Sequence, residues 1–249
     1  MKSKLLKLLI ENRGRAQPPA QRAVRAEGSS EATVYIYDPI VSDQWEAEYF
    51  GGVCPQEMVP LLAGLDVDVI HLRINSPGGD VFAANAICTA LKQHKAKVVA
   101  HIDGVAASAA TAIACACDEV EMADGAMYMI HNAWTIALGD RNDFLEVAAM
   151  LEKIDGTLAD AYAARTGKKR EEMAALMDAE TWFTADEAIA AGLADRKAET
   201  KAKAQAWNLS AYANGPPPDH APEQHQKEPA AAGFFMSTAN ANRLRLLLA

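Results

Sequence analysis

Short apolar, β-branched runs alternate with helix-like segments between residues 32 and 199. The strand-like runs are TVYIYD (33–38), VDVIHLRI (67–74) and KVVAHIDGV (97–105), followed by the shorter EVEMA and AMYMIH. Helix-like segments separate them at 54–65 and 81–94, and another begins at the small-residue run after Ser108. Because such alternation is typical of βαβ units, the sequence predicts an α/β fold with a largely parallel sheet.

Two further helices are predicted after these strands. The first covers residues 142–166, where Phe144, Leu151 and Leu158 belong to a set of apolar residues spaced by three and four positions on one face. The second covers ADEAIAAG, because Thr184 and Glu187 have the spacing of a capping box. Glu187 is therefore interpreted as a structural residue.

Composition divides the chain into three zones. Residues 1–31 are basic and then rich in Pro, Ala and Arg, and are predicted to form a flexible arm. Residues 32–199 are predicted to form the folded domain. Residues 200–249 are predicted to be a mostly disordered polar, Pro-rich tail with a short apolar C-terminus, because this composition buries too little apolar surface to stay ordered.

Charge and cysteine content exclude several classes of partner. The net charge of −9 argues against a large basic face for nucleic acid, and no apolar stretch is long enough to span a bilayer. The four cysteines, Cys54, Cys88, Cys115 and Cys117, lie in apolar surroundings without zinc-site spacing. We expect buried free thiols in a reducing cytoplasm, no metal and no cofactor.

Three short motifs could carry chemistry. In DGVAASAA, Ser108 is either a packing residue bonded to a backbone carbonyl or an exposed nucleophile. In NSPGGD, the two glycines form either a tight turn or an amide that faces a ligand. His131 ends the run AMYMIH, and strand ends in open α/β sheets often build sites, whereas His71 and His101 lie inside predicted strands.

These motifs could combine with a carboxylate into a nucleophilic relay. A serine is a weak nucleophile until a histidine takes its proton, and a carboxylate then orients the imidazole. Asp178 and Glu180 lie in a predicted connecting segment and are available for that role. The amides of Gly79 and of the residue after Ser108 could bind the oxyanion. Spacing alone leaves this relay a hypothesis.

Four stretches together resemble the serine peptidase subunit of the Clp protease family. They are INSPGGDV, DGVAASAA, MIHNAW and AETWFTADEAIAAGLAD, which match in order and spacing and cover about residues 32–196. The wording ETWFTADEA and the unmatched arms are more similar to the phage-encoded branch, whose members act as head (capsid) maturation proteases. The resemblance implies the Clp/crotonase-type fold, a spiral of repeated ββα units, here with flexible N- and C-terminal arms.

The resemblance also assigns site residues. It implies Ser108 as the nucleophile, His131 as the general base, and the amides of Gly79 and Ala109 as the oxyanion hole. The family's acid is usually an aspartate, but its position here holds Glu180, with Asp178 as the alternative. The family also implies a homo-oligomeric ring, in which segment 142–166 is the handle through which stacked rings meet.

The leading hypothesis is an ATP-independent serine endopeptidase that cleaves phage structural or scaffold proteins in the host cytoplasm or inside the prohead. Its long arms do not match the short axial loops of housekeeping members. The alternative is a housekeeping-type subunit that works with an ATP-dependent unfoldase. A crotonase-fold acyl-CoA enzyme would not need Ser108 and His131, and an inactive scaffold-binding subunit would not need to retain them together with the glycines.

Overall fold

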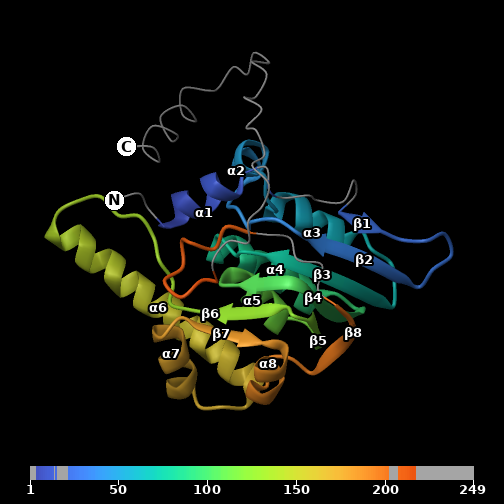
Figure 1. Ribbon diagram of the computed structural model, residues 1–249. Coiled ribbons are helices and arrows are strands. Elements are labelled where there is room, and N and C mark those ends of the chain that lie inside the picture. The colour runs from blue at the N-terminus through green and yellow to red at the C-terminus, as the bar shows by residue number, and fades with distance from the viewer. Residues whose placement is uncertain (1–3, 14, 16–21, 202–206, 217–249) are drawn as a thin grey trace.

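The computed structural model describes residues 4–13, 15, 22–201 and 207–216, and these form one mixed sheet with helices packed around it (Figure 1). The sheet has the order β1-β2-β3-β4-β5-β8, and β6 pairs with both β4 and β7. The strands are β1 (Ala23–Val24), β2 (Glu31–Ile36), β3 (Val69–Ser76), β4 (Lys97–Ala107), β5 (Glu119–Asp124), β6 (Met127–Ile130), β7 (Thr181–Thr184) and β8 (Arg196–Lys201).

Most neighbouring strands are parallel, as the sequence predicts. The pairs β2–β3, β3–β4, β4–β5, β5–β8 and β4–β6 are parallel, whereas β1–β2 and β6–β7 are antiparallel. Strand β4 is long enough to pair with β5 along its first half and with β6 along its second half. The α/β class is therefore confirmed.

The helices begin and end where local chemistry favours it. Thr184 and Glu187 form the predicted capping box, and Asp140 with Asp143 forms another at the start of the long helix, which ends at the left-handed Gly167. The helices are α1 (Lys4–Asn12), α2 (Gln44–Phe50), α3 (Pro55–Ala63), α4 (Val81–Gln93), α5 (Ala109–Cys115), α6 (Arg141–Thr166), α7 (Arg170–Asp178) and α8 (Ala185–Ala191). None of these described helices is both long enough and apolar enough to cross a membrane.

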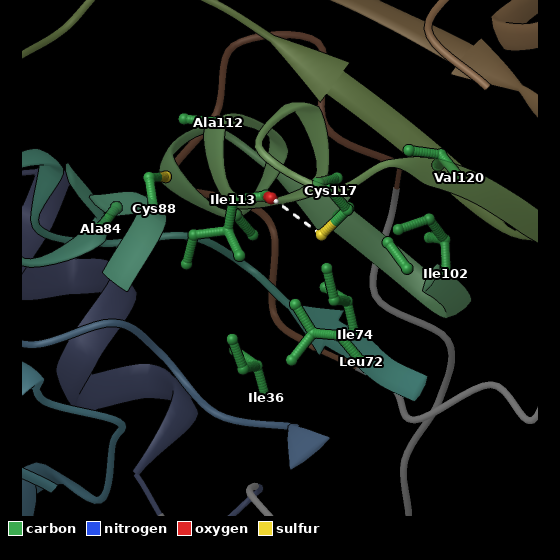
Figure 2. Close-up of a cluster of buried hydrophobic side chains, with 14 of the residues drawn as sticks. Ile36, Leu72, Ile74, Ala84, Cys88, Ile102, Ala112, Ile113, Cys117 and Val120 are labelled. Carbon is green, nitrogen blue, oxygen red and sulfur yellow. Dashed lines mark hydrogen bonds between the residues drawn. The ribbon is translucent and has the colours of Figure 1, made fainter. Parts of the chain in front are cut away.

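The main core lies between the sheet and helices α4 and α5. Alternate residues of β2 and β3 are buried, including Ile36, Leu72 and Ile74, and they face Ile113 of α5 (Figure 2). The small side chains of α5 let this helix pack closely, and all its residues from Ala109 to Ala114 are buried. The tight run of alanines after Ser108 is thus explained by packing under the sheet.

The four cysteines are free thiols, as the sequence predicts. Cys54, Cys88 and Cys117 are buried, and Cys115 is half-buried. Burial raises the pKa of the Cys88 thiol to about 12 and that of Cys115 to about 11, so both stay protonated at neutral pH.

Parts of both predicted arms are folded against the domain. Leu8 and Leu9 of α1 are buried, β1 joins the sheet, and Trp207 and Tyr212 are buried in the C-terminal segment 207–216. The structure therefore differs at these residues from the flexible arm expected over 1–31 and the disordered tail expected over 200–249. The reason is that their apolar side chains pack on distant parts of the chain, which local composition does not reveal. Within the two predicted arms, residues 1–3, 14, 16–21, 202–206 and 217–249 lie outside the described part.

Candidate active site

Ser108 lies at the junction between β4 and α5 in an unusual backbone conformation. Its φ is 55° and its ψ is −125°, a region that residues with a side chain rarely adopt, and such strained residues cluster at functional sites. The amide of Ser108 donates to the carbonyl of Met129, which anchors the turn to β6. Its side chain makes no helix-capping hydrogen bond. The hydroxyl is therefore not engaged with the backbone of its own helix.

His131 follows β6 directly and meets the Ser108 hydroxyl. The parallel register pairs Ala107 of β4 with Met129 of β6, so the two strand ends lie side by side and the residues just beyond them converge. The Nε2 atom of His131 is 2.8 Å from the Oγ atom of Ser108. This is hydrogen-bonding distance, and it is the contact that a general base needs with a serine nucleophile.

The surroundings of His131 keep its imidazole neutral. Burial lowers its pKa to about 4; the negative charge of Glu180 opposes this shift, and the positive charge of Lys4 reinforces it. The rings of Trp134 and Tyr212 stand nearly perpendicular to the imidazole, with centroids 5.7 Å and 5.1 Å away. A neutral imidazole at pH 7 can accept a proton, so the site is prepared for base catalysis.

The Gly78–Gly79 turn has room only for glycine, because Gly78 lies against Ser108 and Gly79 lies against Ile40. Gly78 has a φ of 88°, and a Cβ added there would lie 2.8 Å from the Cβ of Ser108. Gly79 has a φ of 148°, and an added Cβ would overlap the carbonyl oxygen of Ile40. The close approach supports the second interpretation of NSPGGD, in which the backbone faces a site rather than only turning the chain.

Two backbone amides beside Ser108 are available to a ligand. Ala109 is the first residue of α5, where helical N–H groups lack partners within the helix. In the described part of the chain, neither the Ala109 amide nor the Gly79 amide donates a hydrogen bond to a backbone carbonyl in the turns, loops and helix caps. Gly79 and Ser108 also line the same pocket. These are the features expected of donors to an oxyanion.

A pocket of about 100 Å³ opens beside the Ser108–His131 pair. Apart from the two paired residues and Gly79, most of its wall is apolar. Its apolar lining comes from Val81, Phe82, Trp134, Met150, Leu151, Ile154 and Leu158. This lining is suited to an apolar side chain next to the Ser108 hydroxyl.

Glu180 does not reach His131 by a hydrogen bond in the described structure. Its carboxylate accepts the backbone amides of Ala213, at 2.7 Å, and of Asn214. The residue has a φ of 47°, between α7 and β7. Its direct effect on His131 is that of a nearby negative charge. The contact differs from the direct one inferred from the sequence because two successive amides of the C-terminal segment occupy both carboxylate oxygens.

Asp178 also makes no hydrogen bond to His131 in the described structure. It is the last residue of α7, whereas the sequence placed it in a connecting segment. Its carboxylate accepts a hydrogen bond of 2.6 Å from the Asn132 side chain, and Asp155 accepts the Ala133 amide at 2.6 Å. Because the helix ends between them, Asp178 and Glu180 diverge. Asp178 supports the loop after His131.

Sequence reasoning missed the C-terminal segment that packs on the site. Trp207, Leu209 and Tyr212 form a cluster with Leu8 of α1 and Met129 of β6. In Figure 1 this segment, coloured orange to red, passes between α1 and β6. The stretch WNLSAYA was a usable signal, because its two aromatic residues stand out in an otherwise polar tail. Among the described residues, no group of three or more His, Cys, Asp or Glu side chains could hold a metal ion.

Comparisons with known proteins agree on one family. The model of the Clp protease family matches residues 29–201. The ATP-dependent Clp protease proteolytic subunit 3 of Rhodococcus jostii (strain RHA1) is 35% identical over 143 residues, which cover 56% of this chain and 70% of that protein. The ATP-dependent Clp protease proteolytic subunit of Streptococcus gordonii is 33% identical over 130 residues, which cover 51% and 66%.

A solved structure shows the same fold. A mutant of ClpP1 from Listeria monocytogenes superposes with a TM-score of 0.56 and 26% identity, and the match covers 68% of this chain and 91% of that one. The chain thus spans about two thirds of the length of the curated relatives, and nearly all of the solved structure. The segments 4–13 and 207–216 lie outside the residues that match the family model.

Proposed function

The chain belongs to the Clp protease family, and on that basis we propose that it is a serine-type endopeptidase whose reaction is carried by Ser108 and His131. The observation that supports this most directly is the 2.8 Å contact between Ser108 Oγ and His131 Nε2, next to an apolar pocket. We further propose residues 32–199 as the peptidase domain and a cytoplasmic location.

The proposed reaction begins with attack by Ser108. Its Oγ atom bonds to the scissile carbonyl carbon while its proton passes to Nε2 of His131. The carbonyl oxygen becomes an oxyanion and accepts hydrogen bonds from the Gly79 and Ala109 amides. The imidazolium then gives its proton to the leaving amine as the peptide C–N bond breaks. An acyl-serine remains.

Water completes the cycle. His131 takes a proton from a water molecule, whose oxygen attacks the acyl carbon, and the proton returns to Ser108 as the carboxylic acid product leaves. In both halves the imidazole becomes positively charged. The negative charge of Glu180 favours that state, so we propose Glu180 as the acid that acts through space, with Asp178 as the weaker alternative.

Assembly into a ring is part of the proposal. The inner half of α6 is buried through Leu158, Ala159 and Tyr162, whereas Phe144, Leu145 and Met150 of its outer half are exposed. In Figure 1 the outer half of α6 projects away from the sheet. Exposed apolar side chains in a row are typical of an association surface. Contacts between copies through α6 would cover them.

Two cellular roles fit such a peptidase, and different observations favour each. The relatives are named as ATP-dependent proteolytic subunits, which favours a partner unfoldase ATPase and makes this the leading role. The segments outside the family match, and the ETWFTADEA wording, favour head maturation with a capsid or scaffold protein as substrate. Both roles use the same peptide-bond hydrolysis.

One set of assays tests the activity and the role. A fluorophosphonate probe should label Ser108, identified by peptide mass, and the protein should hydrolyse short peptides with apolar residues. No labelling and no hydrolysis would refute the proposed peptidase. A folded substrate degraded only with a Clp-type unfoldase and ATP supports the first role. Nucleotide-independent cleavage of a scaffold protein whose gene lies beside this one supports the second.

A further inference from the structure

The C-terminal segment 207–216 brings Tyr212 to the side of His131, and it lies outside the residues that the family model matches. We propose that Tyr212 is a positioning residue, which holds the imidazole of His131 in its hydrogen bond to Ser108 and shields it from water. The inference rests on the proposed peptidase function and adds to it a component carried by the C-terminal tail.

The Tyr212 side chain contacts both the proposed base, His131, and the turn that precedes the proposed oxyanion hole. Its ring packs edge-on against His131 at a centroid distance of 5.1 Å and an interplanar angle of 81°. Its hydroxyl donates a hydrogen bond to the carbonyl of Pro77, the residue before Gly78 and Gly79. Tyr212 therefore links the imidazole to the turn that carries the Gly79 amide.

The Tyr212 phenol is buried and stays protonated. Burial raises its pKa well above the usual value, and the Ser108 side chain opposes this only in part through a hydrogen-bonding interaction. A protonated phenol remains a donor to Pro77. Trp134 and Trp182 pack on the same ring, with centroids 5.6 Å and 6.0 Å from it, so the side chain has a defined orientation.

Hydrogen bonds fix the segment on both sides of Tyr212. Before it, Asn208 and Asn12 of α1 form a reciprocal pair, in which the Asn208 amide donates to Asn12 Oδ1 at 2.7 Å and Asn12 Nδ2 donates to the Asn208 carbonyl at 2.9 Å. Asn12 is buried, so this pair is protected from water. The indole of Trp207 donates to Asn75 at the end of β3.

After Tyr212, the Glu180 carboxylate accepts the amides of residues 213 and 214. The Asn214 side chain also donates to the carbonyl of Ala179 at 3.0 Å. The carboxylate at the family's acid position thus holds the segment that carries Tyr212. Through this contact Glu180 also acts indirectly on His131.

Packing replaces a hydrogen bond in orienting His131. Within the described structure, the ring nitrogens of His131 make one hydrogen bond, between Nε2 and Ser108 Oγ, and no carboxylate bonds to Nδ1. The ring is instead confined by Trp134 and Tyr212. The same two rings exclude water from the imidazole, and this burial lowers its pKa. Loss of Tyr212 would free the ring to rotate and would hydrate it.

The segment does not close the pocket beside Ser108. Residues of the segment are absent from the described lining of that pocket, which comes from β3–α4, the turn at Ser108, the stretch after His131, and α6. The Ser108–His131 contact is already at hydrogen-bonding distance with the segment in place. These two observations favour a supporting role over an inhibitory one.

The test compares three full-length variants: Tyr212→Ala, Tyr212→Phe and, as the matched control, Ser210→Ala, whose exposed hydroxyl on the same segment makes only a solvent-exposed 3.3 Å hydrogen bond to Glu11. We expect Tyr212→Ala to lower kcat for a short peptide by about 10-fold or more, because the imidazole is no longer held. Tyr212→Phe keeps the ring and should recover most of the rate. Ser210→Ala should match the wild type.

The pH dependence of kcat/KM separates positioning of His131 from a purely structural role, because a purely structural role would not change the pKa of the imidazole. The groups that face His131 are Glu180 from the α7–β7 turn and Lys4 from α1, together with the Ser108 and Tyr212 hydroxyls. Hydration in Tyr212→Ala should raise the pKa of His131 from about 4 toward 6.5, so the acid limb of kcat/KM should move up by at least about one pH unit. Tyr212→Phe should leave the limb in place.

Three results would overturn the inference. A rise of kcat in Tyr212→Ala would make the segment an inhibitory strap, and an unchanged kcat and acid limb would make it irrelevant to catalysis. If Tyr212→Ala and Tyr212→Phe lose kcat equally and the acid limb of kcat/KM does not shift, Tyr212 contributes only to folding. If Tyr212→Ala does not fold, Tyr212→Leu has the same expected outcomes. A wild type without Ser108-dependent hydrolysis would instead refute the proposed function itself.

Discussion

Glu180 accepts a hydrogen bond from the backbone amide of Ala213 at 2.7 Å. Glu180, which we propose as the acid, is thus joined to a segment beyond the family-matched residues and makes no direct hydrogen bond to His131. Glu180 still lies close enough for its charge to raise the pKa of His131 against the larger effect of burial. In the proposed site Glu180 therefore has two effects on the imidazole, one electrostatic and one through the segment it holds.

Replacing Glu180 with Gln should lower kcat by about 10-fold or more, because an imidazolium formed in the reaction loses its nearby negative charge. The pKa of His131 should fall further, so the acid limb of kcat/KM should move to lower pH, opposite to the shift expected for Tyr212→Ala. Asp178→Asn is the matched comparison and should change kcat by less than about 3-fold. Steady-state kinetics from mildly alkaline to strongly acidic pH measures both. If Asp178→Asn lowered kcat strongly and Glu180→Gln left it unchanged, Asp178 and not Glu180 would be the acid.

Replacing Ser108 with Ala should abolish peptide hydrolysis and probe labelling, with a loss on the order of 10³-fold or more in kcat. The fold should persist, because the Ser108 hydroxyl caps no helix and its backbone amide still donates to Met129. Thermal unfolding followed by circular dichroism checks the fold beside the kinetics. Thr89→Ala on α4, an exposed hydroxyl loss away from the site, is the control and should keep full activity. Hydrolysis by Ser108→Ala at the wild-type rate would exclude Ser108 as the nucleophile.

The rate should stay high in mildly acidic solution. Because the pKa of His131 is lowered to about 4, its imidazole is neutral and able to act as a base well below pH 6.5. We expect kcat/KM for a short peptide to be nearly constant from about pH 7 to about pH 5 and to fall as the pH approaches 4. An acid limb centred near 6.5 would contradict the buried, neutral state of His131.

The same shift predicts how folding stability depends on pH. Between about pH 6.5 and 4, the unfolded chain binds a proton at His131 that the folded protein does not, so the free energy of unfolding should decrease as the pH falls through this window. The group contributes roughly 2–3 kcal/mol across the window. Urea unfolding at neutral pH and near the lower end of the window measures the change. It should be smaller by about that amount in His131→Gln, and an identical change in both proteins would contradict the linkage.

Adding a methyl group at Gly79 should inactivate the enzyme. The Cβ would overlap the Ile40 carbonyl, and the positive φ disfavours any side chain, so the amide beside Ser108 would be displaced. Gly28→Ala is the control, since Gly28 also has a positive φ of 74° but open space around it. We expect Gly28→Ala to cost about 1 kcal/mol of stability without loss of kcat. Full activity in Gly79→Ala would remove its amide from the proposed oxyanion hole.

The protein should associate with itself through α6. Phe144 is 51% exposed and Met150 is 47% exposed, which is unfavourable for large apolar side chains unless another copy covers them. Phe144→Ser with Met150→Ser should shift the sedimentation coefficient to a smaller species in analytical ultracentrifugation. Glu146→Gln on the same helix should leave the assembly intact. A wild type that sediments as a monomer at micromolar concentration would contradict the proposed ring.

Local patterns were enough to single out Ser108, His131 and the Gly78–Gly79 turn as candidates, and the resemblance to the Clp family assigned their roles. Each was visible in neighbours close in sequence: a run of small residues that packs as α5, a strand that ends at Ile130, and a Pro-Gly-Gly turn after β3. The alternation of strands and helices was readable for the same reason, since period and turn residues are local properties. Their roles in catalysis remain predictions.

Only the tertiary structure decided what surrounds His131. Tyr212 is 135 positions away from Pro77 and Asn208 is 196 positions away from Asn12, and no local pattern states that such segments meet. Composition indicated disorder in both arms, because the number of apolar residues in a segment does not show which distant surface buries them. The end of helix α7 likewise separates Asp178 from Glu180, which their nearby positions in the sequence do not reveal. Burial, and with it the pKa of His131, is a property of the packed chain.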